Sequence, residues 1–382
     1  MGKKELHLFI LWEKSRYCQS EIIEDIKNNF KILEIVEVIW DYDKFSENLT
    51  RFYGVSLPKN SKKERRCGIG PFLLIIIQDE NPVYAIRKTT KGPRIVNINM
   101  FDSKEMYRSW TGATDLIHAT NDEVETNHDL TLLKGLNTSD YMSKNSEFDG
   151  EIKKNKCNLI GANGWNDLNE LFYVLNSTIE YVVLRNFEPL PDEYHIENHG
   201  DIDILTTNYE NMKYITNSND FYHDGKRVNN IVMINDIPVQ FDFRYVCDGY
   251  YDSKWEYEMI KNRIYDRGFY HMDYYNYYYS LIYHAVVHKK DIAEDYKVRI
   301  DTMKSKINTD LTVNKDKNYL ITELKEFMSS KGYSFTFPKD YSVFFNKSVI
   351  RVNIPLSKIF YKYVSLNLFR LRRVLNVYNE KN

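Results

Sequence analysis

Two aspartates separated by one apolar residue mark the stretch of the chain best suited to chemistry. Asp201 and Asp203 alternate with Ile202 and Ile204 in the sequence Gly-Asp-Ile-Asp-Ile-Leu at 200–205. Alternate side chains of a β-strand point to the same face, so the two carboxylates would lie side by side with the isoleucines behind them. Adjacent carboxylates repel each other unless a cation lies between them. The pattern therefore predicts a divalent ion held by hard oxygen ligands, Mg²⁺ or Mn²⁺.

A third carboxylate is expected on a neighbouring strand. Asp242 lies in a second alternating run, 237–244, and the preceding segment, 228–234, is also typical of a strand. A turn at Asn235–Asp236 would join the two runs as a hairpin. With the first two aspartates, Asp242 would complete a two-metal phosphoryl-transfer site, whose ions activate the attacking oxygen and stabilise the leaving one. The alternative is that the aspartates mark a solvated strand end.

Three segments resemble the polymerase-β-type nucleotidyltransferase superfamily, in particular its branches that act on small molecules. They are Tyr181–Asn186, Gly200–Leu205 and Gln240–Asp242, within residues 164–299. The resemblance implies a domain with a mixed sheet, metal ligation by all three aspartates, and an NTP or CDP-activated donor. The superfamily normally holds the triphosphate with a Gly-Gly or Gly-Ser turn before the carboxylate pair. In this chain Arg185 and Asn186 stand nearest that place, and they are the residues we expect to contact the donor.

A basic turn would supply further phosphate ligands. Asp224 and Gly225 form a turn signal, and Lys226 and Arg227 follow directly. Next to the carboxylates, these two cations would reach a substrate phosphate. The alternative is an exposed hairpin tip whose charges face water.

The N-terminal part of the chain alternates strand and helix patterns. The strand patterns fall at 7–12, 31–40 and 70–77, and the helix patterns at 20–30 and 43–53. The order strand-helix-strand-helix-strand predicts a ferredoxin-like α+β domain over residues 1–136.

Part of this domain resembles nucleoside diphosphate kinase. The matching residues are Gly70–Ile75 and Ile117–Asp122, followed by Glu125, Asp129 and Leu130. The resemblance, over residues 5–135, implies that His118 accepts a phosphoryl group, that Asp129 orients it, and that Arg108 binds phosphate. The chain departs from the family at Trp12, where the kinase has a phosphate-binding lysine. A degenerate nucleotide-binding module and a purely structural domain are the alternatives.

Length and composition favour a multidomain globular protein and argue against several other classes of protein. A chain of 382 residues predicts two or three domains, and a net charge of −2 argues against nucleic acid as a partner. The four cysteines are widely spaced without a Cys-x-x-Cys pair, which argues against zinc and against a disulfide framework. No apolar stretch approaches the ~20 residues of a membrane span, and the first residues lack the apolar run of a signal peptide. We therefore expect a cytoplasmic protein.

The predicted organisation is an α+β chain with a helical C-terminal part. The regions are a ferredoxin-like domain at 1–136, a polar linker at 137–158, a nucleotidyltransferase-like domain at 159–305, and a C-terminal α/β region at 306–382. Helices are predicted at 166–176, 250–264, 273–300 and 318–331, and short strands at 335–352.

The last predicted helix, 356–378, mixes apolar residues with lysine and arginine. Such a helix can lie on an anionic bilayer, which would bring the protein to the inner face of the membrane. The alternative is a terminal helix that packs on the protein itself.

The leading functional hypothesis is a Mg²⁺-dependent enzyme. It would transfer a nucleotidyl or phospho-alcohol group to a hydroxyl or phosphate of a small molecule or of a surface glycan, as in surface polysaccharide biosynthesis. Asp242 would also help to deprotonate the acceptor. The alternatives are a nucleoside-diphosphate-kinase-like phosphotransferase that uses His118, and a nucleotide-binding protein without catalysis.

Overall fold

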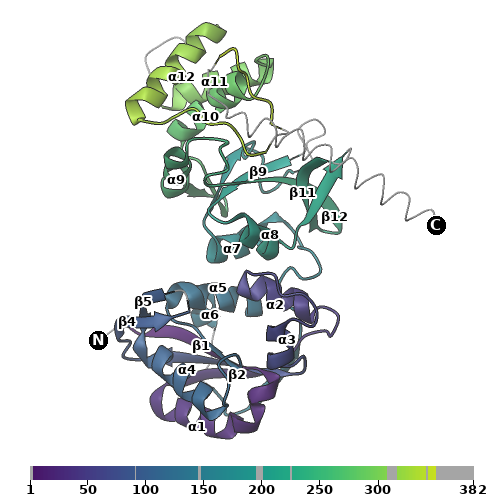
Figure 1. Cartoon of the computed structure of the whole chain (residues 1–382), viewed down its shortest axis with the longest axis vertical. Helices are drawn as coiled ribbons and strands as arrows, with labels where there is room; N and C mark the ends of the chain where they lie inside the picture. Colours follow the sequence, from purple (N-terminus) through teal and green to yellow (C-terminus); the bar gives the residue numbers. More distant parts are fainter. Residues whose placement is uncertain are drawn as a thin grey trace, which may run out of the picture. The chain divides into compact units, whose positions relative to one another are not determined.

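The computed structural model describes residues 3–90, 92–144, 148–194, 201–223, 226–307, 316–340 and 343–349, without the side chains of 222, 223 and 226–228. The chain divides into two compact units (Figure 1). The first extends to Trp165 and also includes Tyr214–Asn217. The second begins at Asn166 and contains the rest of the described chain.

The first unit is built on a five-stranded sheet in the order β6-β1-β3-β2-β7. Its strands are β1 (Glu5–Leu11), β2 (Lys31–Ile39), β3 (Phe72–Asp79), β6 (Ile117–Ala119) and β7 (Ile152–Lys156). Neighbours are antiparallel except β2 and β7, which are parallel. The order β6-β1-β3-β2, with helices between β1 and β2 and between β3 and β6, is the split βαβ arrangement of ferredoxin-like domains. The predicted α+β fold is confirmed.

Helices and a small hairpin complete the first unit. The helices are α1 (Gln19–Asn29), α2 (Phe45–Tyr53), α3 (Lys62–Cys67), α4 (Ile98–Trp110), α5 (Glu123–Lys134) and α6 (Thr138–Lys144), and the hairpin is β4 (Tyr84–Thr89) with β5 (Gly92–Asn97). A short 3₁₀ helix, Glu13–Cys18, follows β1. The Asp122 side chain accepts a hydrogen bond from the Glu125 amide and so caps α5.

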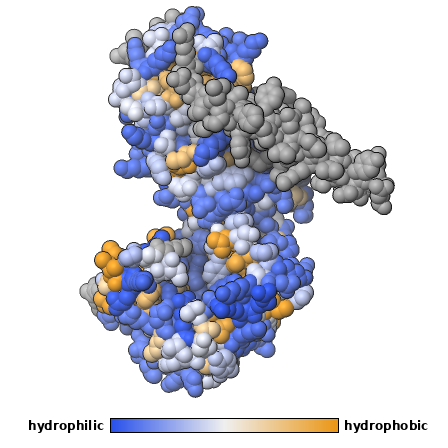
Figure 2. Space-filling model, in the orientation of Figure 1, coloured by the Kyte–Doolittle hydropathy of each residue, from blue (hydrophilic) through white to orange (hydrophobic). Residues whose placement is uncertain are grey.

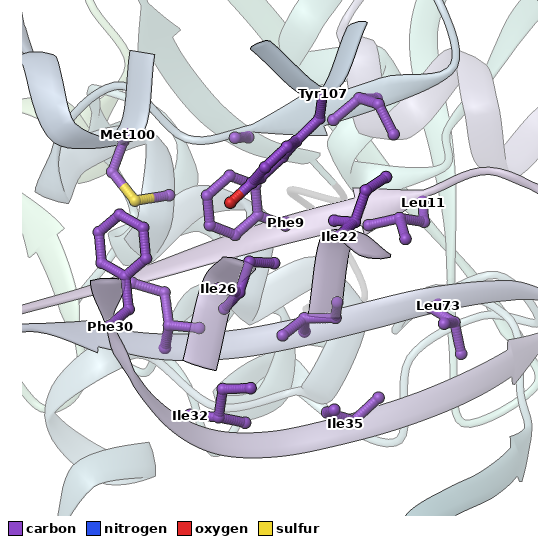
Figure 3. Packing of buried hydrophobic residues seen from close by; sticks show 14 of the residues in the cluster. Phe9, Leu11, Ile22, Ile26, Phe30, Ile32, Ile35, Leu73, Met100 and Tyr107 are labelled. Carbon is purple, nitrogen blue, oxygen red and sulfur yellow. The ribbon is translucent and has the colours of Figure 1, made fainter. Parts of the chain in front are cut away.

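The core of the first unit forms where α1 and α4 cover the sheet. Ile22 and Ile26, one helical turn apart on α1, are fully buried (Figure 3). The Phe9 ring of β1 lies 5.5 Å from that of Tyr107 and 5.9 Å from that of Phe30. Burying each large apolar side chain contributes about 1.5–3 kcal/mol. Because β3 is covered on both faces of the sheet, its residues from Phe72 to Ile77 are all apolar and buried.

The prediction of a linker at 137–158 was wrong. Its described residues form α6 and then β7, which pairs with β2 at the edge of the sheet. Every residue of β7 is exposed, and three of the five are lysine. A charged edge strand protects a sheet from pairing with other chains, and such a strand lacks the apolar alternation by which buried strands are recognised.

The second unit contains a seven-stranded mixed sheet in the order β10-β11-β12-β9-β8-β14-β13. Its strands are β8 (Tyr181–Arg185), β9 (Asp201–Thr206), β10 (Asn219–His223), β11 (Lys226–Ile234), β12 (Ile237–Tyr245), β13 (Ile264–Asp266) and β14 (Phe269–His271). The pairs β9–β12 and β8–β14 are parallel, and the other pairs are antiparallel. The predicted hairpin around Asn235–Asp236 and the predicted mixed sheet are both present.

The helices that follow Trp165 are α7 (Leu168–Thr178), α8 (Tyr209–Thr216), α9 (Ser253–Lys261), α10 (Tyr274–Val287), α11 (Glu294–Lys306) and α12 (Lys317–Lys331). All lie in the second unit except the end of α8, from Tyr214, which is grouped with the first. The single helix predicted at 273–300 is in fact two helices, α10 and α11. The described residues of 306–382 belong to this unit, because α12 packs on α10 with the rings of Tyr279 and Phe327 stacked 3.8 Å apart. No strand is present among the described residues of 335–349, where short strands were predicted.

Hydrophilic residues cover most of the face seen in Figure 2, with hydrophobic residues in small scattered groups. Among the described residues, no helix is long and apolar enough to cross a bilayer. The basic helix predicted at 356–378 lies outside the described residues.

Candidate active site

Two neighbouring strands bring the three predicted aspartates together. β9 and β12 are parallel, and their register places Asp242 beside Asp203. Asp201, two residues before Asp203, shares its face of the sheet. One carboxylate oxygen from each aspartate lies within 4.8 Å of the others. We call Asp201, Asp203 and Asp242 the carboxylate cluster.

The carboxylate cluster is largely closed from water. The side chains of Asp203 and Asp242 are only 1% and 7% exposed, and Asp201 is partly exposed. Apolar side chains at the alternate positions of both strands are buried: Ile202, Ile204, Phe241 and Phe243. Removing an ionised carboxylate from water costs several kcal/mol unless it is paired. The partners of these side chains therefore decide what the cluster can do.

Two arginines supply part of that pairing. Arg185, at the end of β8, donates to Oδ1 of Asp203 through Nη2. Arg244 donates to Oδ2 of Asp242 through both Nε and Nη2, at 3.0 and 2.6 Å. Both guanidiniums also lie over the ring of Tyr250, at 5.8 Å for Arg185 and 4.6 Å for Arg244. The sheet register explains the first pair, because Arg185 stands opposite Asp203 on the antiparallel neighbour.

Each of the two buried aspartates nevertheless keeps one unpaired oxygen. Among the described residues, Oδ2 of Asp203 and Oδ1 of Asp242 have no hydrogen-bond partner. Buried polar atoms are normally satisfied, so two such oxygens in one cluster require an explanation. Carboxylate oxygens are the ligands that Mg²⁺ and Mn²⁺ take, and the cluster fits such an ion.

The pKa values of the aspartates are also unusual. Burial raises the pKa of Asp203 to about 8, although Arg185 acts in the opposite direction. Burial, and next the charge of Asp242, raise the pKa of Asp201. Burial alone would lower the pKa of Arg244, but the neighbouring carboxylates hold that pKa above its usual value. Asp201 and Asp203 therefore hold their protons to higher pH than an ordinary aspartate, and a cation bound between them would favour release of those protons.

A second layer of side chains lies behind the arginines. The Tyr250 hydroxyl lies 3.3 Å from Nη1 of Arg185 and 2.7 Å from Nδ1 of His284 on α10. His284 stacks on Tyr296 of α11, with ring centroids 5.4 Å apart. Burial holds the pKa of His284 well below its usual value, so the ring is neutral near pH 7. The layer therefore fixes Tyr250 without adding charge.

Sequence reasoning missed Arg244 and Tyr250. Arg244 could have been predicted from the sequence, because it lies two residues after Asp242 and therefore shares that face of the strand. Tyr250 follows the strand in an irregular segment, and no local pattern signals its contact with both arginines.

The other predicted phosphate ligands of this unit have different surroundings. Asn186 accepts a hydrogen bond from Arg299 of α11 and has a positive φ of 58°. Lys226 and Arg227 begin β11, opposite His223 and Tyr222, and their side chains lie outside the described part of the structure. Of the expected donor contacts whose side chains the structure describes, Arg185 is the one placed at the carboxylate cluster.

In the first unit, the predicted phosphoryl acceptor is paired as expected with its neighbour on α5. Nε2 of His118 lies 2.7 Å from Oδ2 of Asp129, and Nδ1 of His128 lies 2.9 Å from Oδ1. Asp129 is buried. Burial would raise the pKa of Asp129, but the two histidines outweigh it and lower that pKa below its usual value. Both oxygens of this carboxylate are therefore occupied.

The surroundings of His118 are aromatic. The rings of Phe52 and Tyr53 lie 5.3 and 5.9 Å from that of His118. Trp12 is fully buried and packs on Phe72 at 4.7 Å. The position at which the kinase family has a lysine is therefore part of an aromatic core.

Arg108 lies in a basic cleft nearby. It donates to the Ile117 carbonyl through Nε at 3.2 Å and pairs with Glu105 through Nη1 at 2.7 Å. With Lys14, Arg65 and Arg66, it lines a cavity of about 920 Å³. Four cations and one carboxylate around this cavity suit an anionic ligand.

His118 and Asp129 also lie within 4.8 Å of Glu125, a combination that can hold a metal ion. However, Oε2 of Glu125 accepts hydrogen bonds from the amide and the side chain of Asn121, at 2.7 and 2.6 Å. Asp129 is occupied by its histidines. This group is therefore a satisfied hydrogen-bond network, in contrast to the carboxylate cluster.

Comparisons with known proteins add little. No family model matches the chain, and no curated protein matches it. One solved structure that is similar in part is a nucleoside diphosphate kinase of Aquifex aeolicus, at 13% identity and a TM-score of 0.22. The match covers 34% of this chain and 93% of the kinase. At that TM-score the likeness carries no argument, and membership of the polymerase-β-type superfamily has no support from family models or curated proteins.

Proposed function

We propose that the second unit is a Mg²⁺-dependent transferase of nucleotidyl or phospho-alcohol groups. The observation that carries the proposal is the pair of unpaired oxygens on two buried carboxylates of one cluster. Most buried side-chain oxygens of proteins have a hydrogen-bond partner. Asp201, Asp203 and Asp242 would hold the ion, which would polarise the transferred phosphorus and stabilise the leaving oxygen.

The side chains of the cluster would then divide the work. Asp203 is the least exposed and would anchor the ion, whereas Asp201 is the most exposed and would face the donor. Asp242 would accept the proton of the acceptor hydroxyl as the new oxygen–phosphorus bond forms. With an NTP donor, the bond to pyrophosphate breaks. With a CDP-alcohol donor, the acceptor attacks the phosphorus that carries the alcohol, and CMP leaves.

The acceptor would be a hydroxyl or phosphate of a small molecule or of a surface glycan precursor. A nucleotide-activated donor and free cysteines are consistent with work in the cytoplasm. Attachment of the basic segment 356–378 to an anionic bilayer would bring the enzyme to lipid-linked acceptors.

The test is turnover of the four NTPs and of CDP-glycerol, CDP-ribitol and CDP-choline with Mg²⁺ and a panel of sugar and sugar-phosphate acceptors. Wild type is compared with Asp203→Asn and with Asp266→Asn, which alters an exposed aspartate paired with an arginine. Release of pyrophosphate or CMP that is lost only in Asp203→Asn supports the proposal. Equal release by all three proteins contradicts it.

A second candidate function is phosphotransfer at His118. It is favoured by the hydrogen bond that Nε2 of His118 donates to Asp129, which leaves Nδ1 of His118 free of hydrogen bonds to the described residues. Nδ1 would attack the γ-phosphorus of an NTP, the bond to the bridging oxygen would break, and an NDP would leave. Radiolabel from the γ-phosphate that stays on the protein, and is lost in His118→Ala, would establish this function. No label on wild type would exclude it.

A further inference from the structure

Arg185 and Arg244 occupy the carboxylates that a metal ion would need. Each arginine takes one oxygen of its aspartate, and the other oxygen has no partner among the described residues. A cation that reaches the cluster, in which only Asp201 is partly exposed, can therefore coordinate these two oxygens before either arginine leaves. This arrangement permits an exchange in two steps, in which the ion binds first and the guanidiniums are released afterwards.

We infer, on the basis of the proposed function, that Arg185 and Arg244 move from the carboxylates to the diphosphate of the donor when the ion binds. A guanidinium binds carboxylate and phosphate with the same planar fork of donors, so either partner satisfies it. The ion takes over the charge of the aspartates, and the released arginines recognise the phosphates. Metal and donor binding are thereby coupled.

The charges of the site support this order. Three carboxylates and two guanidiniums leave the cluster with one excess negative charge when all are ionised, and Asp340, 3.1 Å from Nη1 of Arg244, adds to it. Such a site repels a polyphosphate. Four carboxylates and two guanidiniums give a net charge of −2, which one divalent ion cancels. The donor is therefore expected to bind after the ion or together with it.

The Tyr250 ring contacts both guanidiniums and can stabilise them while they change partners. Its ring lies below the two guanidiniums, and its hydroxyl lies 3.3 Å from Nη1 of Arg185. Cation–π contact stabilises a desolvated guanidinium without using its hydrogen-bond donors. Because His284 holds the hydroxyl at 2.7 Å, the ring stays in place while the arginines change partners.

The first measurement is the affinity of wild type for Mn²⁺ and for inorganic pyrophosphate, each alone and in the presence of the other. Titration calorimetry is corrected with protein-free mixtures of the two probes. We expect each probe to raise the affinity for the other by the same factor, at least about tenfold, as coupling requires. Independent binding of the two probes would overturn the inference and leave the proposed metal site intact. Absence of Mn²⁺ binding would instead contradict the proposed function.

The second measurement uses Arg244→Gln. Without its arginine, Asp242 is free for the ion, so the affinity for Mn²⁺ should rise about three- to tenfold while pyrophosphate binding in excess Mn²⁺ falls at least tenfold. Opposite changes in the two affinities distinguish an exchange from general damage, which would lower both. Lower affinity for both probes, or no change in either, would overturn the inference.

Two further variants keep this test interpretable. Arg244→Lys retains the charge and should keep part of the pyrophosphate affinity, even where the glutamine variant unfolds. Arg87→Gln removes an arginine from a similar two-bond pair with an exposed carboxylate, Asp102 of the first unit. It should leave both affinities unchanged, and a change there equal to that of Arg244→Gln would count against the inference.

Discussion

Both units contain buried carboxylates beside cationic side chains, and the carboxylates of the two units have different numbers of hydrogen-bond partners. In the first unit, Asp129 has one histidine on each oxygen. In the second, Asp203 and Asp242 each have an arginine on one oxygen and no described partner on the other. A closed network positions its members, whereas one with unpaired buried oxygens is suited to bind a ligand. This difference supports the proposal that metal-dependent chemistry takes place at the carboxylate cluster, and that Asp129 positions its two histidines.

The largest effect is expected on turnover, when the carboxylate at the centre of the cluster is replaced. Asp203→Asn replaces the oxygen that would hold the ion with an amide, and turnover should fall by about 10³-fold or more, equivalent to roughly 4 kcal/mol in the barrier. Release of pyrophosphate or CMP measures it, with Asp266→Asn as the matched surface control. A loss smaller than tenfold would show that the cluster is not the centre of the reaction.

The next effect is stabilisation by the ion itself. At about 100 times its Kd, Mn²⁺ should stabilise the folded state by about 2.7 kcal/mol. Amide exchange followed by mass spectrometry should become slower in β9 and β12, whereas β6 and α5 of the first unit should change little. Slower amide exchange around His118 instead would show that the ion binds in the first unit, contrary to the proposal.

A somewhat smaller effect is expected for Asp129→Asn, with a defined dependence on pH. Because the folded pKa of Asp129 lies below its unfolded value, its carboxylate stabilises the protein above about pH 4 and loses this contribution as the pH falls. The variant should therefore be roughly 1–3 kcal/mol less stable at pH 6, and the difference should shrink as the pH falls below the unfolded pKa of about 4. Urea unfolding across this range measures it, and a difference that grows toward low pH would have the wrong sign.

The smallest effect is expected for His118→Ala in the metal-dependent reaction. The His118 ring is held by Asp129 within the first unit and contributes no ligand to the carboxylate cluster. Turnover of the donor should stay within about twofold of wild type. A large loss would mean that the two sites act in one reaction, and the separation drawn between them would be wrong.

Much of the fold was predictable because its buried strands carry clear patterns. The unbroken apolar run of β3 and the alternation in β9 and β12 follow from the faces that these strands bury. β7 escaped prediction because an exposed, lysine-rich edge strand buries nothing. The break between α10 and α11 escaped too, since neither glycine nor proline marks it.

The carboxylate cluster could be predicted from the sequence, whereas the side chains that contact it could not. Asp201 and Asp203 share a face because of strand geometry alone, and one further strand suffices to add Asp242. The pairing of Arg185 depends on the antiparallel register of β8 with β9, and the contact of both arginines with Tyr250 depends on tertiary packing. Local sequence encodes neither, so the electrostatic balance of the site emerged only from the structure.

The most direct test of the central claim is a Mn²⁺ titration followed by electron paramagnetic resonance, on wild type, Asp203→Asn and Asp129→Asn. The comparison of the two buried carboxylates predicts that wild type and Asp129→Asn bind Mn²⁺ alike and that Asp203→Asn loses the tight binding. Binding that survives in Asp203→Asn but disappears in Asp129→Asn would contradict the account, because the ion would then belong to the first unit.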